Sequence, residues 1–124
     1  MARKRSPTLT DGETKIMNVL WEKGRATVAD IMAGLPPGQR VAYNTVQTML
    51  RILEQKNYVA HEQVGRAFDY RPLVERTAAR QRALGHLVNA LFDGSPSLLV
   101  LDVLKDERLN ADEIKRLKRL VEDA

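Results

Sequence analysis

The chain has 124 residues, 44% of them hydrophobic and 29% charged, which is ordinary for one folded domain with or without an appendage. The longest unbroken apolar run is Leu98–Leu101, whereas a transmembrane helix needs about 20 such residues, so no membrane span is predicted. The absence of cysteine excludes disulfides, thiolate metal sites and cysteine nucleophiles, and it fits a cytoplasmic protein. Two histidines cannot build a typical zinc site alone, so we expect neither a metal nor a cofactor.

The positive charge is concentrated in the first part of the chain. Residues 1–72 hold 11 Lys and Arg against 7 Asp and Glu, whereas residues 73–124 hold nine of each kind. The net charge of +4 therefore belongs to the first part, and the isoelectric point near 9.6 is in the range of nucleic-acid-binding domains. Charge alone also fits a slightly basic protein with a disordered tail, so the asymmetry matters only if this part has a binding architecture.

Two helices are predicted near the start of the chain. Residues 1–8 are basic and contain proline, so we expect a disordered tail there. Residues 10–13 have the pattern of a capping box and begin a first helix, which Gly24 ends. Thr27 then caps a second helix, and the Pro-Pro-Gly turn at 36–38 ends it.

A third helix, from about Ala42 to about Lys56, has two chemically different faces. One face is apolar and is formed by Val46, Met49, Leu50 and Leu53. The opposite face is polar and free of acid, and its members are Asn44, Gln47, Thr48 and Arg51, with Thr45 at its border. A protein-binding helix would normally expose Leu, Phe or Trp anchors instead, so this face favours DNA recognition.

A β-hairpin is predicted after the third helix, from strand-like residues at 58–64 and 68–71. Gly65-Arg66-Ala67 joins them as a tight turn with Arg66 at its tip, and Arg25-Ala26 fits a further brief strand. The fold class is therefore mainly α with a small β-hairpin. The order of helix, helix, helix and hairpin is typical of a winged helix-turn-helix, whose third helix enters the major groove.

Each polar residue of the third helix has a DNA-binding interpretation and a plainer one. Arg51 can form two hydrogen bonds to O6 and N7 of guanine. It could instead pair with Glu54 or Gln55 on the helix surface. Gln47 suits adenine, and Thr45 and Thr48 suit a phosphate or a thymine methyl group; all three are also ordinary surface residues. Contacts with the DNA backbone are expected from Arg40, Tyr43 and Arg66.

Other classes of function fit the sequence less well. The chain has no Ser/His/Asp spacing, phosphate-binding glycine loop or metal cluster, so no enzyme is predicted. A winged-helix module that binds protein or RNA is the alternative. RNA readers usually expose aromatic side chains on strands, and Tyr58, Phe68 and Tyr70 are better explained as the packing face of the hairpin.

Helices are also predicted in residues 74–92, after Ser95-Pro96 and after Asn110. Their apolar side chains exceed what one thin layer can cover, so we predict a two-fold homodimer. The residues expected in its interface are Leu84, Leu87, Val88, Leu91, Leu98, Leu99, Leu101, Leu104, Leu117 and Leu120. In the alternative, the last two helices fold back on the N-terminal domain.

Several segments resemble the penicillinase-repressor (BlaI/MecI/CopY) family of bacterial winged-helix repressors. They are LTDGE at 9–13, VLW at 19–21, TVQTMLRIL at 45–53 and FDYRP at 68–72, and residues 97–104 and 109–120 are similar too. The resemblance implies a homodimeric transcriptional repressor on palindromic operators, with a tail (1–8), a DNA-binding domain (9–73) and a dimerisation region (74–124). The positions that match the DNA-contacting helix of the family are Asn44, Thr45, Gln47, Thr48 and Arg51.

The sequence departs from the family pattern in two places. Copper-responsive members have a Cys-rich C-terminus, which this chain lacks. In β-lactam-responsive members an inducing protease cuts an Asn-Phe bond, and the matching position here is Asp102-Val103. The resemblance therefore specifies a repressor and leaves the inducing signal open, including an inactivating protease or sensor system as a partner.

Overall fold

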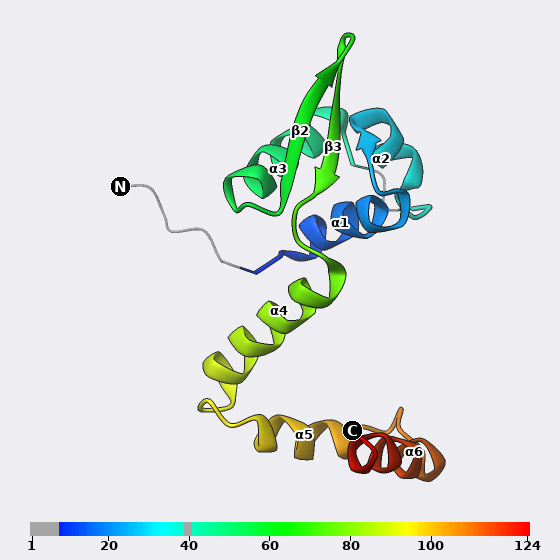
Figure 1. The fold of residues 1–124 in the computed structure, drawn as a ribbon, viewed down its shortest axis with the longest axis vertical. Helices are drawn as coiled ribbons and strands as arrows, with labels where there is room; N and C mark the ends of the chain where they lie inside the picture. The colour runs from blue at the N-terminus through cyan, green and yellow to red at the C-terminus, as the bar shows by residue number, and fades with distance from the viewer. Residues whose placement is uncertain (1–7, 39–40) are drawn as a thin grey trace. The chain divides into compact units, whose positions relative to one another are not determined.

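The computed structural model describes residues 8–38 and 41–124 (Figure 1). Its elements, in chain order, are α1 (Asp11–Lys23), β1 (Ala26–Thr27), α2 (Val28–Gly34), α3 (Tyr43–Gln55), β2 (Val59–Val64), β3 (Ala67–Pro72), α4 (Arg76–Leu91), α5 (Pro96–Leu104) and α6 (Ala111–Glu122). The predicted fold class, mainly helical with a small β-hairpin, is confirmed. The chain forms two compact units, an N-terminal unit that ends at Ala83 and a C-terminal unit that starts at Leu84.

Complete capping boxes begin the first two helices, as the sequence predicts for α1. The Thr10 hydroxyl accepts the backbone N–H of Glu13 at 3.2 Å, and the Glu13 carboxylate accepts that of Thr10 at 2.9 Å. Thr27 and Asp30 form the same pair of bonds at 3.2 and 3.1 Å. The hydrogen bond from the Thr27 backbone is the main cause that lowers the pKa of Asp30. These bonds satisfy N–H groups that have no partner inside the helix.

The core of the N-terminal unit lies between α1, α2, α3 and the sheet. Its completely buried side chains are Ile16, Met17, Leu20, Ile31, Val46, Leu50, Leu53, Tyr58 and Val59. Trp21 packs against this core, and its indole N–H donates to the carbonyl of Val74 at 2.9 Å. The three apolar helix faces thus meet in one cluster, which leaves the polar face of α3 outside it.

The sheet has the strand order β1-β3-β2 and is antiparallel throughout. Val64 pairs with Ala67, so the hairpin turn consists of Gly65 and Arg66 and is one residue shorter than predicted. Gly65 has a φ of 62°, a conformation that glycine adopts without strain. The brief extra strand begins at Ala26 instead of Arg25.

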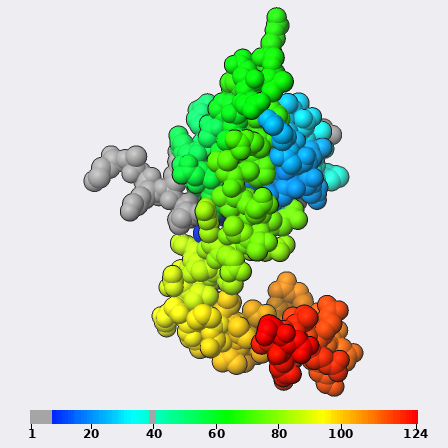
Figure 2. Space-filling model, in the orientation of Figure 1, coloured from blue at the N-terminus to red at the C-terminus, as the bar shows by residue number. Residues whose placement is uncertain are grey.

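One aromatic residue of the hairpin lies where the sequence did not place it. Tyr58 and Tyr70 are buried, as expected, but the Phe68 side chain is 44% exposed. Phe68 is on the same face of β3 as Tyr70, since alternate residues of a strand share a face. It lies in the outer part of the hairpin, which projects beyond the rest of the N-terminal unit (Figure 2, green). Its ring lies 4.7 Å from the His61 ring, measured between centroids.

The C-terminal unit has capped helices with exposed apolar side chains. Ser95 caps α5, with Pro96 in its first turn, and the Asn110 side chain accepts the backbone N–H of Glu113 at 2.8 Å to begin α6. Neither helix contains a buried residue. Within the part of the chain that the structure describes, no single helix is long and apolar enough to cross a membrane; only the bent pair α4 and α5 passes by length and composition.

Candidate DNA-binding interface

The helix α3 separates a buried face from an exposed polar one. Its buried side is formed by Val46, Leu50 and Leu53, which have no exposed surface. On the other side Asn44, Thr45, Thr48 and Arg51 are exposed, and Gln47 is half-buried. The structure thus brings together on one surface all five residues that the sequence assigned to recognition. Because no acidic residue lies in the first turn, the start of α3 does not repel phosphate.

At the N-terminus of α3 the N–H of Thr45 donates to the carbonyl of Ala42 at 3.0 Å, and no side chain of the described residues bonds to the N–H groups before it. The residue at its N-cap is Ala42, and none of the described side chains caps the helix. The first N–H groups of a helix lack an internal acceptor and can bind phosphate oxygens. Tyr43, which was expected to contact the DNA backbone, begins α3 with a side chain that is 49% exposed. Arg40, expected in the same role, lies outside the described residues.

The hydroxyl of Thr48 is already engaged within the helix. It donates to the carbonyl of Asn44, one turn earlier, at 2.9 Å. A hydroxyl oxygen that donates its hydrogen still has lone pairs with which to accept. This bond therefore fixes the Thr48 side chain in a conformation that can accept from a base amino group or pack its methyl against thymine.

Arg51 is free of the intrahelical ion pair that the sequence allowed. Glu54 is instead bonded to Nδ1 of His61 on β2, with 2.5 Å between the two atoms. Within the described residues no ion pair engages Arg51, so its guanidinium is available to a ligand. Burial, and secondly the negative charge of Glu54, raise the pKa of the neighbouring Tyr70 hydroxyl. Sequence reasoning missed this link between α3 and the hairpin, because it joins residues of different elements.

The hairpin carries one cation at its tip, and a second cation contacts the middle of its two strands. Arg66 is exposed at the turn, and no described side chain pairs with it. Arg25 donates from Nε to Asp69 on β3 at 2.7 Å, and its guanidinium lies 3.5 Å from Glu62 on β2. Arg25 thus links both strands of the hairpin to the segment before β1.

A buried ion pair connects the start of α1 with the end of α3. The ammonium group of Lys56 lies 2.7 Å from Oε1 of Glu13, and both side chains are at most 7% exposed. Lys56 also donates to the carbonyl of Thr8 at 3.0 Å. The sequence pointed to Glu13 only as a capping residue. Its second role, which is to hold α3 in place, depends on a contact between residues 43 positions apart.

The residues expected in the dimer interface are mostly exposed in the single chain. Val88 is buried and Leu99 is half-buried. The others are exposed: Leu84, Leu87, Leu91, Leu98, Leu101, Leu104, Leu117 and Leu120. Between α5 and α6 an apolar groove of about 540 Å³ is lined chiefly by Val100, Val103, Leu104, Ile114, Leu117 and Val121. Within residues 8–38 and 41–124, no group of three or more His, Asp and Glu side chains could hold a metal ion.

Known proteins resemble the chain in sequence along nearly its whole length. The penicillinase repressor of Bacillus licheniformis is 26% identical over 120 residues, which cover 97% of this chain and 94% of that protein. The methicillin resistance regulatory protein MecI of Staphylococcus aureus (strain N315) is 24% identical over 113 residues, or 91% of this chain and 92% of that protein.

Solved structures resemble the winged-helix part. The solution structure of the DNA-binding domain of the repressor BlaI has a TM-score of 0.52 and 28% identity, and the match covers 61% of this chain and 93% of that one. Monomeric Bacillus licheniformis BlaI in complex with the blaP half-operator gives a TM-score of 0.50 with the same identity and coverage. Residues 9–123 match the penicillinase repressor family. The chain therefore belongs to the penicillinase repressor family, as its sequence motifs predicted.

Proposed function

We propose that the protein is a DNA-binding transcriptional repressor that acts as a homodimer on a two-fold symmetric operator, with α3 in the major groove. The observation that carries this proposal is the division of α3, whose core residues Val46, Leu50 and Leu53 have no exposed surface while its acid-free polar side faces solvent. The major groove is just wide enough for one α-helix. The similar BlaI domain was solved with a DNA half-operator, which supports the same use of the fold here.

Within this proposal the residues of α3 have different tasks. Arg51, unpaired within the described residues, forms two parallel hydrogen bonds to O6 and N7 of guanine. Thr45 and Thr48 contact a phosphate or a thymine methyl group, Gln47 bonds to adenine, and Asn44 lies at the entry of the helix. Arg66 and Tyr43 bind the DNA backbone, which adds affinity without base preference.

A second copy of the chain is the partner that covers the C-terminal unit. Exposed leucines and valines of α5 and α6, such as Leu101 at 53% and Leu120 at 61%, form a surface too apolar for a free monomer. A two-fold interface places the same surface on both subunits, and the two reading helices then address two half-sites related by the same symmetry. Because the two half-sites are related by the two-fold symmetry of the dimer, we expect the operators to be palindromic.

Selection of bound fragments from a random double-stranded DNA pool tests the proposal, with a pool of single-stranded RNA as the comparison. We expect enrichment of a DNA consensus whose two halves are inverted copies, spaced by about one helical turn or a multiple of it. A consensus without symmetry would contradict the dimer. Enrichment only in the RNA pool, or no enrichment in either pool, would contradict DNA binding and favour an RNA- or protein-binding winged helix.

A further inference from the structure

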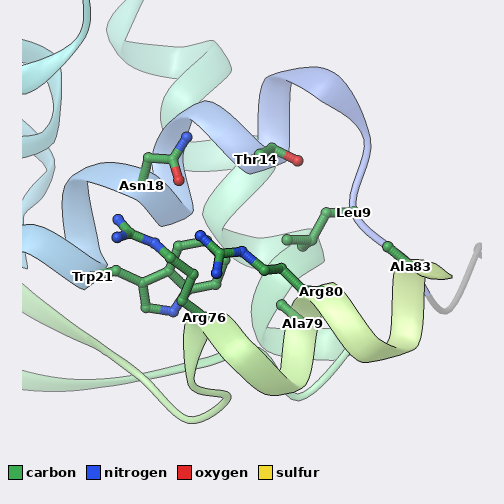
Figure 3. Close-up of a pocket in the computed structure, with 8 residues that line it drawn as sticks. All are labelled: Leu9, Thr14, Asn18, Trp21, Arg76, Ala79, Arg80 and Ala83. Atoms are coloured by element: carbon green, nitrogen blue, oxygen red, sulfur yellow. The ribbon is translucent and has the colours of Figure 1, made fainter. Parts of the chain in front are cut away.

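A pocket of about 300 Å³ lies between α1 and the first turns of α4, within the N-terminal unit (Figure 3). Its wall is apolar where the Trp21 ring and the small side chains of Ala79 and Ala83 line it, and Leu9 closes one side. Such a volume is at the lower end of what small-molecule sites in proteins enclose. The pocket thus has room for a compact ligand and a surface that would shield its apolar part from water.

Two arginines of α4 reach into the same pocket. The guanidinium carbon of Arg76 lies 5.3 Å from the centre of the Trp21 ring, within the range of a cation–π contact. Arg80 follows one turn later, so the two side chains are neighbours on the helix surface. In Figure 3 both extend from α4 toward Trp21. The hydrogen bond from the indole to the Val74 carbonyl, 2.9 Å long, fixes the ring beneath them.

These two positive charges have no negative partner in the pocket. Its lining contains no carboxylate, and among the described residues no ion pair includes Arg76 or Arg80. Other arginines of the chain are paired, such as Arg25 with Asp69 and Arg108 with Asp106. Two like charges beside an apolar wall repel each other, and an anion placed between them would turn this repulsion into attraction.

We propose that this pocket binds a small organic anion, in which a carboxylate or phosphate group is attached to a compact apolar body. The planar guanidinium groups form paired hydrogen bonds with either kind of anion. The apolar body would lie against Trp21 and Ala79, and the amide of Asn18 adds a polar group to the lining. This site shares no residue with the DNA-reading surface of α3, so it does not depend on the proposed function.

The single tryptophan of the chain lies in this pocket and reports on its occupancy. We would titrate the full-length protein with cyclohexanecarboxylate, which does not absorb near the tryptophan band, and follow the fluorescence of Trp21 and the NMR signal of its indole N–H. A saturable change is expected. Cyclohexanecarboxamide, which lacks the charge, should bind at least about tenfold more weakly, the factor of one lost charge-assisted hydrogen bond. Inorganic phosphate should also bind at least about tenfold more weakly, because it has no apolar body to bury against Trp21.

Arg80→Gln and Arg82→Gln make a matched pair of variants, since both remove one charge from α4. Arg82 lies over the ring of Tyr58 and does not line the pocket. Arg80→Gln should weaken cyclohexanecarboxylate binding about tenfold, whereas Arg82→Gln should bind like the wild type. The proposal would be overturned by a titration without saturation, by equal binding of the amide or of phosphate, or by equal effects of the two variants. Circular dichroism of each variant shows whether a loss comes from unfolding, and Arg80→Lys, which keeps the charge, should retain part of the affinity.

Discussion

Lys56 at the end of α3 and Glu13 in the first turn of α1 form an ion pair with 2.7 Å between Nζ and Oε1, and both side chains are almost completely buried. Glu13 also completes the capping box of α1, and Lys56 also binds the carbonyl of Thr8. The pair thus joins the end of α3 to the start of α1. Removal of either partner leaves the other charge buried without an opposite charge beside it.

Lys56→Met should therefore destabilise the protein by about 3–5 kcal/mol, the cost typical of breaking a buried ion pair from one side. Urea unfolding followed by circular dichroism measures this loss. The combined variant Glu13→Gln with Lys56→Met should lose less than the sum of the two single variants, because no unpaired charge remains. Arg25→Gln, which removes an exposed ion pair with Asp69, is the control and should cost less than about 1 kcal/mol. Equal losses in the free energy of unfolding for Lys56→Met and Arg25→Gln would contradict a larger contribution from the buried pair.

The segment between α5 and α6 contains a carboxylate with an unusually low pKa. Hydrogen bonds from the side chain and backbone of Arg108 lower the pKa of Asp106 to about 2. Because the folded pKa lies below the ordinary 3.8, the contribution of these bonds to stability is complete above about pH 4 and is lost as the pH falls through about 2. An NMR titration of the Asp106 carboxyl group should show this midpoint, and Arg108→Gln should raise it toward 3.8. A midpoint near 3.8 in the wild type, or an equal rise in Lys105→Gln, would contradict this explanation.

The exposed apolar groove of the C-terminal unit predicts a dimer that one polar substitution weakens. Leu117→Gln places an amide in the groove between α5 and α6 and should raise the dimer dissociation constant at least about tenfold, since one buried leucine contributes about 1.5–3 kcal/mol. Sedimentation equilibrium measures the constant. Arg116→Gln, on the same helix but outside the groove lining, is the matched control and should leave it unchanged. A wild-type chain that stays monomeric at all concentrations would contradict the proposed dimer.

DNA binding should weaken steeply as salt is added. If about 6–10 phosphates are neutralised per dimer, the logarithm of the affinity should fall with a slope near −0.9 per phosphate against the logarithm of the salt concentration. Arg66→Ala, at the tip of the wing, should reduce that slope by about 1 for each protomer and weaken all duplexes alike. Arg108→Ala removes an equal charge from a residue already paired with Asp106 and should change the slope little. A flat salt response of the wild type would contradict contacts with the phosphate backbone.

The sequence predicted those features of the fold that depend on neighbouring residues. The Thr10–Glu13 capping box, the end of α2 before its Pro-Pro-Gly turn and the polar face of α3 follow from spacing along the chain, and the structure confirms them. The bond between Glu54 and His61 and the meeting of Arg76 and Arg80 in one pocket depend on which elements meet in space.

The exposure of Phe68 was missed for a related reason. Alternation along β3 assigned it to the same face as the buried Tyr70. Whether that face is covered depends on how far the hairpin extends beyond the helices, and the strand pattern carries no information about this length. In the same way, the pattern of α4 identified its apolar residues and could not show that Val88 is buried while Leu91 is exposed.

The claim that α3 reads the operator is tested most directly by fluorescence anisotropy with Arg51→Ala. The variant, the wild type and the control Arg119→Ala would be titrated against the selected operator and against a scrambled duplex of equal length. If Arg51 contacts a base, its loss should cost about 1–3 kcal/mol per half-site on the operator and much less on the scrambled duplex, so that sequence preference falls. The control should keep the preference of the wild type. If Arg51→Ala instead binds both duplexes with the wild-type ratio of affinities, Arg51 does not read sequence and the assignment of α3 as the recognition helix is contradicted.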